Sequence, residues 1–437
     1  MKQAGLWLTA TVLAIAAWTT LNFLATTEGW LLKPIAPEGD VPAFSQALTE
    51  YAQSQNTGNL VFAILDEKGL PVSQQFFSEG RAVNSDSLFG VASLSKWVTA
   101  VGVMTLVEDG ILALDEPVET YLKRWHLPPS EFDNNAVTLR RLLSHTAGIT
   151  DGLGHDGFKP GEPVQALTEH LTKAADADPA VDGRVRVGMA PGSRWMYSGG
   201  SYNLVQLIIE DATGADFTEV MQARVFTPLG MKDTGFTVPR DNPRLAEYFG
   251  ENGERREYPN YTSLAATGLY TSLHDLIIFA QAQLPSSAVG SDQPRLLSDA
   301  SLAQMRAPLA NVDGLDIWGA GVIIYAPLAN GDNVIGHGGQ SPFLNASVRV
   351  NPATGAAFIA IQTGNANALA SDLGTLWTTW QTGKPDLYIL RNTLGDMVLR
   401  ILIGTALIIL LVTILAVIKW RRSRSTHKLS QQLMSGK

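Results

Sequence analysis

Two long apolar runs stand near the ends of the chain, on either side of a segment with mixed apolar and polar positions. Residues 5–25 carry no charge and would span about 31 Å as a helix, close to the thickness of the hydrocarbon core of a bilayer. Residues 401–418 are also uncharged and nearly all aliphatic. The pattern predicts a membrane-spanning helix near each end, within residues 1–26 and 400–418.

Two interpretations of the first run remain open. The small residues Ala14 and Ala16 fit a signal-peptidase site, in which case the segment is a cleaved signal peptide. The apolar run continues well past that site, which favours an uncut anchor.

A basic cluster after the second run predicts the orientation of the chain. The tail, residues 419–437, carries six basic residues and no acid. Basic residues next to a membrane-spanning helix stay on the cytoplasmic side. We therefore expect the tail in the cytoplasm and the residues before the second run outside it.

The segment between the runs, residues 42–384, predicts a single domain with strands near both ends and helices between them. The predicted strands are residues 60–65, 72–77, 319–325, 333–336, 345–350 and 356–363. The predicted helices, besides one at residue 93, are residues 44–52, 164–175, 202–212, 217–225, 273–284 and 367–380. This order predicts an α+β fold, with an antiparallel sheet flanked by helices and an inserted, mainly helical lobe. A cleft between the lobes is the expected place for a site.

Composition excludes several classes of function. The net charge is −9 and the tail contributes +6, so residues 1–418 carry −15. An acidic outer domain argues against binding to nucleic acid, and contact with anionic lipid explains the basic tail. The absence of cysteine excludes disulfides, thiolate metal sites and a cysteine nucleophile.

The strongest candidate for chemistry is the pair Ser93 and Lys96, at the start of a largely apolar segment that predicts a helix. Three residues apart, the hydroxyl and the amine would share one helix face. A neutral amine can take the hydroxyl proton and activate the serine, provided that burial lowers the lysine pKa. Free N–H groups at a helix start would favour the negative charge that develops during attack on a carbonyl. The motif alone is weak, because Ser425 and Lys428 repeat its spacing and Ser93 could simply be an N-cap residue.

Two other segments offer groups for the same chemistry. Tyr197 follows a turn-rich stretch, and its phenol could pass a proton between lysine, serine and leaving group if cations hold its pKa down. Residues 336–340 read Gly-His-Gly-Gly-Gln after an apolar strand. A substrate backbone could lie along such a glycine-flanked edge, and one N–H could serve as an oxyanion donor. The ordinary alternatives are a buried tyrosine and a histidine in a structural turn.

These three segments, in this order, resemble the serine β-lactamase and penicillin-binding-protein superfamily. The most similar branch contains the class C β-lactamases and the D-Ala-D-Ala carboxypeptidases and esterases. Four further segments resemble the same branch: residues 142–149, 197–213, 228–231 and 265–276. The resemblance covers roughly residues 42–380 and implies a β-lactamase/transpeptidase-like fold.

The resemblance also implies a role for each matching residue. Ser93 would be the acylated nucleophile, Lys96 its partner and Tyr197 the tyrosine of the second motif. The oxyanion hole would consist of the backbone N–H groups of Ser93 and Gln340. Four residues would form the substrate-binding strand: His337, Gly338, Gly339 and Gln340.

Two departures from the family pattern bear on the substrate. The family usually has Tyr-x-Asn where this chain has Tyr197-Ser198-Gly199, and that asparagine contacts the substrate amide. His337 stands where a lysine is usual, and a histidine is mostly uncharged above its ordinary pKa of about 6.5. Both changes favour an esterase, or a peptidase for less acidic ligands, over a β-lactamase.

Other classes of site lack their signals in the sequence. Four histidines, His126, His155, His170 and His274, show no metal-binding spacing, so no metal is expected, and no cofactor is implied. His145, in a segment typical of the family, is expected to be structural. The Gly-x-Ser-x-Gly elbow of an α/β-hydrolase is absent from the sequence.

We therefore expect a serine hydrolase anchored in the bacterial cytoplasmic (inner) membrane, with its catalytic domain in the periplasm. It would cleave an amide or ester through an acyl-enzyme, and D-alanyl peptides, esters and β-lactams remain open as substrates. The expected partners are a small-molecule or peptide substrate, with cell-wall peptide among the candidates, and the lipid bilayer. The alternative is a penicillin-binding or sensor-like protein that retains the fold without turnover.

Overall fold

The computed structural model describes residues 2–151, 155–178, 181–250, 252–286, 295–364 and 368–434. At residues 2–4, 423 and 426–434 it describes the backbone only. The chain divides into two compact units. The larger unit is residues Pro34–Thr382, and the smaller one joins residues Met1–Lys33 to residues Gly383–Lys437.

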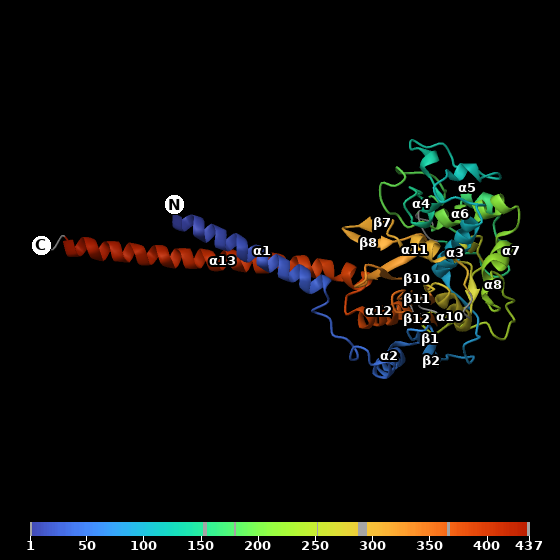
Figure 1. Ribbon diagram of the computed structural model, residues 1–437, viewed down its shortest axis with the longest axis horizontal. Helices are drawn as coiled ribbons and strands as arrows, with labels where there is room; N and C mark the ends of the chain where they lie inside the picture. The colour runs from blue at the N-terminus through green and yellow to red at the C-terminus, as the bar shows by residue number, and fades with distance from the viewer. Residues whose placement is uncertain are drawn as a thin grey trace. The chain divides into compact units, whose positions relative to one another are not determined.

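An eight-stranded antiparallel sheet forms the centre of the larger unit (Figure 1). Its strand order is β2-β1-β12-β11-β10-β9-β8-β7. β1 near the start of the unit pairs with β12 near its end, so the two ends of the domain are neighbours in one sheet. The strands are β1 (Asn59–Leu65), β2 (Pro71–Phe77), β7 (Ala310–Val312), β8 (Leu315–Trp318), β9 (Ile323–Pro327), β10 (Asn333–Ser341), β11 (Leu344–Val350) and β12 (Ala357–Thr363).

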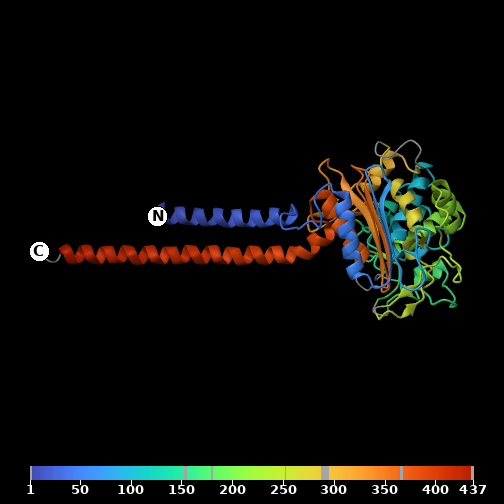
Figure 2. The same cartoon turned by 90° about the horizontal axis from the view of Figure 1, so that it is seen from below.

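Helices cover both faces of the sheet, which explains why β1, β11 and β12 are buried along their whole length. On one face lie α2 (Val41–Gln55) and α12 (Leu369–Thr382), and on the other lie α3 (Ser95–Glu108) and α10 (Leu273–Gln281) (Figure 2). The ring of Phe44 in α2 stacks on Trp380 in α12, with centroids 4.2 Å apart.

A mainly helical lobe is inserted between α3 and the strands at the end of the unit. Its largest helix, α6 (Gly199–Thr213), is buried along most of its length and packs against α4, α5, α7 and α9. Together with the sheet, this lobe gives the α+β architecture that the sequence predicts. The other helices are α4 (Leu139–Leu143), α5 (Leu167–Thr172), α7 (Phe217–Met221), α8 (Thr227–Leu229), α9 (Leu264–Thr267) and α11 (Asp299–Arg306).

Short elements connect these helices. Two small antiparallel pairs join β3 (Phe89–Gly90) to β6 (Tyr270–Thr271) and β4 (Tyr248–Phe249) to β5 (Arg255–Arg256). The remaining turns are the 3-10 helices η1 (Ala92–Leu94), η2 (Val118–Thr120) and η3 (Asn134–Ala136), and the π-helical turn η4 (Gln222–Phe226).

The smaller unit is a pair of antiparallel helices, α1 (Lys2–Thr27) and α13 (Leu387–Met434), which lie side by side in Figures 1 and 2. The indole of Trp18 donates to the carbonyl of Arg400 at 3.2 Å. A Cβ on Gly404 would lie 2.1 Å from that indole, so the two helices are in close contact there. The stretches Gly5–Thr27 and Leu387–Arg422 are each long and apolar enough to cross a membrane.

Several elements differ from the sequence prediction. The helix predicted at residues 164–175 shortens to α5, because the amide of Gln165 binds the backbone of Lys173 and Ala175 beyond the helix end. The strand predicted at residues 319–325 begins only at Ile323, after a turn with Gly321 at φ +80°. The strand predicted at residues 333–336 continues to Ser341. The predictions missed β7, β8 and α11, and Asn367 of the last predicted helix lies outside the described residues.

Candidate active site

Ser93 lies in η1, a single turn that leads directly into α3. Ala92 immediately before it has φ +45°, a left-handed conformation that costs a residue with a side chain roughly 1–2 kcal/mol. Ser93 is half-buried, whereas both of its neighbours, Ala92 and Leu94, are buried. The strained turn thus presents the hydroxyl at an accessible position, and strain of this kind clusters at functional sites.

Lys96 lies in the first turn of α3, and its Nζ lies 3.1 Å from Ser93 Oγ. The amine also donates to the carbonyl of Ala266 at 2.8 Å, and among the described residues it forms no ion pair. The side chain is only 3% exposed. Burial lowers the pKa of Lys96 to about 7, against the opposing effect of Asp151. A large fraction of the amine is therefore neutral near physiological pH, as a base for Ser93 must be.

Tyr197 completes a cluster of three polar groups. Its ring lies 5.0 Å from Lys96 Nζ, and its hydroxyl forms a hydrogen bond with Ser93. Burial raises the pKa of Tyr197, and the bond to Ser93 offsets this only in part. In the sequence analysis, the proton-passing role is conditional on cations that hold the pKa of Tyr197 down, and that condition is not met. Because the phenol keeps its proton at neutral pH, it can donate a hydrogen bond and relay a proton, but it is not a phenolate base.

A buried carboxylate holds the loop that carries Tyr197. Ser198, the N-cap of α6, donates from Oγ to Asp151 Oδ1 at 2.6 Å and accepts from the N–H of Ser201 at 2.9 Å. The N–H of Gly200 donates to Asp151 Oδ2 at 2.5 Å. A carboxylate at a helix N-terminus is favourable, since free N–H groups point toward it. The sequence analysis did not single out Asp151, because nothing near it in the sequence indicates its partners.

Strand β10 borders the cluster along one edge. It pairs with β9 only as far as Gly336, and beyond that point its free edge lies against η1. Ser341 and Leu344 are the last paired residues of the β10–β11 hairpin, whose loop has two residues. Hydrogen-bonded and non-hydrogen-bonded pairs alternate along an antiparallel ladder, so the next residue, Gln340, points its backbone N–H away from β11 and toward the free edge. The side chain of Gln340 is exposed. The free edge of β10 therefore places backbone groups beside the turn that carries Ser93.

His337 is buried under this edge and carries no charge. Its Nδ1 lies 2.6 Å from the carbonyl of Gly338, and its ring meets the ring of Trp318 edge-on at 5.4 Å. Burial and, next, the charge of Lys96 lower the pKa of His337 to about 3. The imidazole is therefore neutral throughout the physiological range and does not replace the lysine that a substrate carboxylate would need.

His145 lies on the other side of Tyr197, with ring centroids 4.4 Å apart. Its Nδ1 accepts from the N–H of Ser198 at 3.1 Å, and its carbonyl accepts from Met196 at 2.8 Å. Burial, Lys96 and His337 together lower its pKa well below the ordinary value. Through these contacts His145 binds the backbone on both sides of Tyr197 and fixes the position of that loop.

Trp318 connects the aromatic groups of the site. Its ring centroid lies 5.6 Å from that of Tyr197 and 4.9 Å from that of His145. Its indole N–H donates to the carbonyl of Leu143 at 3.2 Å. The sequence analysis missed this residue, because β8, which carries it, is a four-residue strand with no recognisable alternation.

Ser93, Lys96 and Tyr197 lie beside a glycine-rich strand edge. A comparison of the chain with known protein families agrees with this arrangement. A family model described as "Beta-lactamase" matches residues 44–376. The chain belongs to the beta-lactamase family.

Two relatives of this chain are named for different properties, one as a penicillin-binding protein and the other as an esterase. Penicillin-binding protein 4 of Amycolatopsis lactamdurans is 31% identical over 294 residues, which cover 63% of this chain and 72% of that protein. Esterase EstB of Burkholderia gladioli is 34% identical over 167 residues, 36% of this chain and 40% of the esterase. This chain thus spans well under half of the length of that esterase, and only the first relative is matched over most of its length.

A solved structure supports the fold. The octameric penicillin-binding protein homologue from Pyrococcus abyssi superposes with a TM-score of 0.63, over 79% of this chain and 78% of that one. Its sequence identity is 23%, so the likeness concerns the fold of the beta-lactamase family.

One departure from the beta-lactamase family pattern has a structural counterpart. Gly199 stands where the family motif usually has asparagine. A Cβ at this position would lie 2.7 Å from Nε2 and 2.9 Å from Cδ2 of His155. The imidazole of His155 therefore occupies the space into which a side chain at position 199 would project, and only glycine fits there.

Proposed function

We propose that this member of the beta-lactamase family is a serine hydrolase that works by two-step acyl transfer. The observation that supports this most directly is the 3.1 Å contact between Ser93 Oγ and the buried amine of Lys96. The lowered pKa of Lys96 makes the pair a nucleophile with its base.

In the first step, Ser93 Oγ forms a bond to the carbonyl carbon of the substrate, and its proton moves to neutral Lys96. The carbonyl oxygen becomes an anion, which the N–H groups of Ser93 and Gln340 would stabilise; one such donor contributes roughly 3–4 kcal/mol to lowering a barrier. The bond to the leaving group then breaks. Tyr197, which keeps its proton and touches Ser93, would relay the proton from Lys96 to the departing oxygen or nitrogen.

In the second step, a water molecule attacks the acyl ester on Ser93. The base that takes its proton is again the cluster of Lys96 and Tyr197. The water oxygen bonds to the carbonyl carbon, and the bond to Ser93 Oγ then breaks. The proton taken from the water passes from the base to Oγ, which restores the hydroxyl and releases the acid.

The substrate that fits best is a neutral ester or amide. His337 supplies no cation, and the place of the asparagine that would contact a β-lactam amide is filled by His155. The partly exposed ring of Trp195 lies beside Tyr197 and would pack against an apolar acyl group, with the buried ring of Trp318 behind it. The name of the relative EstB agrees with an ester substrate.

We further propose that α1 and α13 anchor the enzyme in the cytoplasmic membrane, with the larger unit in the periplasm. α1 is uncut in this proposal, because Trp18 binds the backbone of α13 and packs on Gly404. Lys419 lies over the ring of Trp7, at the end of the pair where the basic residues gather. Mass spectrometry of the mature protein should find the original N-terminus, and a protein that begins after Ala16 would contradict the anchor.

The catalytic proposal is tested with the full-length protein in detergent. Wild type should react with a fluorophosphonate probe at Ser93 and hydrolyse p-nitrophenyl esters, whereas Ser93→Ala should do neither. Ser425→Ala is the matched control, since Ser425 repeats the spacing to a lysine, and it should behave as wild type. Unchanged ester turnover in Ser93→Ala would refute the proposal.

The same panel separates the substrates and the non-enzymatic alternative. D-Ala-D-Ala peptides and nitrocefin are compared with the esters, and esters should be turned over fastest. Labelling of Ser93 without turnover of any substrate would favour a penicillin-binding or sensor-like protein.

A further inference from the structure

Three side chains of the kinds that bind metal ions meet beside the N-terminus of α6. His155, His170 and Asp176 each offer one ligand atom, and these atoms lie within 4.8 Å of one another. The three residues come from a loop, from α5 and from the loop after α5. No metal is expected from the sequence, because the spacing of the histidines matches no motif. In the folded domain, however, residues that are distant in the sequence come together.

The cluster is buried, and its groups are not fully partnered. The side chains of His170 and Asp176 are 0% and 1% exposed, and that of His155 is 8% exposed. His170 Nε2 lies 2.5 Å from Asp176 Oδ1. His155 Nδ1 points at the same oxygen from 3.7 Å, beyond hydrogen-bond distance, and is a buried nitrogen without a partner in the described part of the chain.

A fourth residue, Asn203 of α6, contacts the far side of both imidazoles. Its side-chain amide lies 3.2 Å from His170 Nδ1 and 3.4 Å from His155 Nε2. The two ends of an amide are nearly indistinguishable in shape. With its oxygen toward the rings, Asn203 would accept from both N–H groups and leave His155 Nδ1 and His170 Nε2 as lone pairs facing Asp176.

We propose that His155, His170 and Asp176 bind one divalent transition-metal ion, with zinc as the ion that best suits the site. Two imidazoles and one carboxylate, with water in the fourth position, are a common zinc ligand set, with bonds of roughly 2.0–2.2 Å. Asn203 would orient both rings from the second shell, as carbonyl and carboxylate oxygens commonly do for metal-bound histidines.

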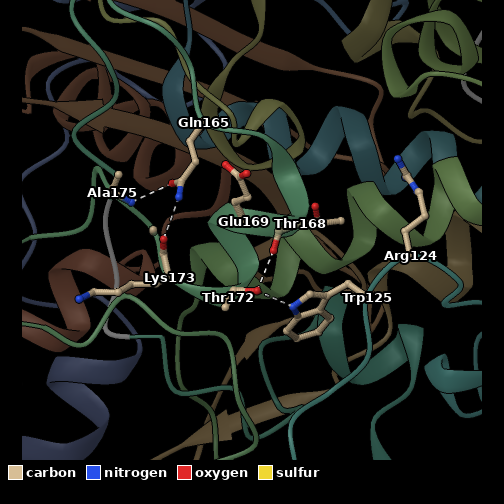
Figure 3. A pocket seen from close by; sticks show the side chains of 9 residues that line it. Arg124, Trp125, Gln165, Thr168, Glu169, Thr172, Lys173 and Ala175 are labelled. Carbon is tan, nitrogen blue, oxygen red and sulfur yellow. Dashed lines mark hydrogen bonds between the residues drawn. The ribbon is translucent and has the colours of Figure 1, made fainter.

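The surrounding structure holds two of the ligands in place. Gln165 accepts from the N–H of Ala175 at 2.9 Å and donates to the carbonyl of Lys173 at 3.1 Å, just before Asp176 (Figure 3). On the outer face of α5, the indole of Trp125 donates to Thr172 at 3.1 Å. The N–H of Gly157 donates to Asp176 Oδ2 at 3.2 Å, and Oδ1 faces the two imidazoles between which the ion would bind. Such support fixes ligand geometry before the ion arrives.

The site would link this loop to the candidate active site. His155 fills the space beside Gly199, two residues after Tyr197. In a chain without cysteine, the ion would supply a cross-link between the loop of His155, α5 and the loop after α5. The proposal concerns binding and stability and does not depend on the reaction proposed above.

Metal content is measured on the full-length protein in detergent, after exposure to zinc and extensive dialysis. Wild type should retain about one zinc per chain, and His170→Ala and Asp176→Ala should retain none. The matched control is His126→Ala, because His126 is exposed and its partner is Glu119, which is not a member of the cluster. Cobalt in place of zinc should give the visible absorption of a tetrahedral site.

Two further measurements keep the proposal testable if a ligand variant fails to fold. A chelator should lower the unfolding temperature of wild type, and added zinc should restore it. Asn203→Asp, which can only accept, should retain zinc, whereas Asn203→Leu should bind it roughly 10–100-fold more weakly. Substoichiometric zinc in wild type together with an unfolding temperature that chelator leaves unchanged would overturn the proposal. Loss of zinc in Asn203→Asp to the same degree as in Asn203→Leu would overturn the role of Asn203.

Discussion

A Cβ atom on Gly339 would lie 1.9 Å from the carbonyl oxygen of Val91, so β10 passes directly against the turn that carries Ser93. Backbone touches backbone at this point, and no flexible side chain can move aside. The glycine thereby sets the distance between Ser93, the proposed nucleophile, and the strand edge that would hold a substrate.

Gly339→Ala should therefore displace β10 from η1 and separate the two oxyanion donors. We expect kcat for an ester to fall by about 10²–10³-fold, the cost of losing one donor, together with a lower unfolding temperature. Gly235→Ala is the control, because a Cβ there meets nothing within 4 Å. Equal activity of the two variants would show that β10 does not contribute to the reaction.

The pKa of Lys96 predicts the pH dependence of the reaction. Burial lowers it to about 7, and the base must be neutral, so kcat/KM should fall about tenfold per pH unit below 7 and level off above it. His337, with its pKa lowered to about 3, should add no inflection between pH 5 and 9. Rates of p-nitrophenyl ester hydrolysis across this range test both points, and a flat profile would exclude Lys96 as the titrating base.

His337 predicts how the enzyme treats acidic substrates. The ordinary pKa of lysine, about 10.4, lies about four units above that of histidine, so a lysine keeps far more of its charge at this buried position. A hydrogen bond to such a charged group contributes about 1.5–3 kcal/mol. His337→Lys should therefore raise kcat/KM by roughly tenfold or more for a D-Ala-D-Ala peptide with a free carboxylate, relative to its amide. The exposed His126→Lys should leave that ratio unchanged, and an unchanged ratio in both variants would contradict the prediction.

Because Gly199 and His155 share one space, we expect the effects of substitutions at the two positions on stability to be coupled. Gly199→Asn alone should destabilise the protein and not create β-lactamase activity, because the new side chain would collide with the imidazole. In a His155→Ala background, where that space is open, Gly199→Asn should cost much less stability than it does in wild type, with every variant measured in the presence of a chelator. Unfolding temperatures and nitrocefin turnover of the single and double variants measure this coupling, and additive effects would show that the two side chains do not compete.

The sequence was informative where neighbours in the chain are also neighbours in space. Ser93 and Lys96 lie three residues apart, and one helical turn suffices to bring their polar atoms together. The hairpin of β1 and β2 follows in the same way from alternation and a short turn, and the two apolar runs from composition alone. The family resemblance supplied the link between Ser93, Tyr197 and β10, which spacing by itself does not contain.

Tertiary structure alone decided which distant groups meet. Trp318 and His145 lie against the ring of Tyr197, and Asp151 binds Ser198 and Gly200, which follow Tyr197 in the chain. No local pattern in the sequence indicates these partners. His155, His170 and Asp176 lie apart in the sequence and converge only because a loop folds against α6. The charge states of Lys96, Tyr197 and His337 were also decided by tertiary structure. Their pKa values depend on burial by residues from across the fold, and burial is a property of the packed domain.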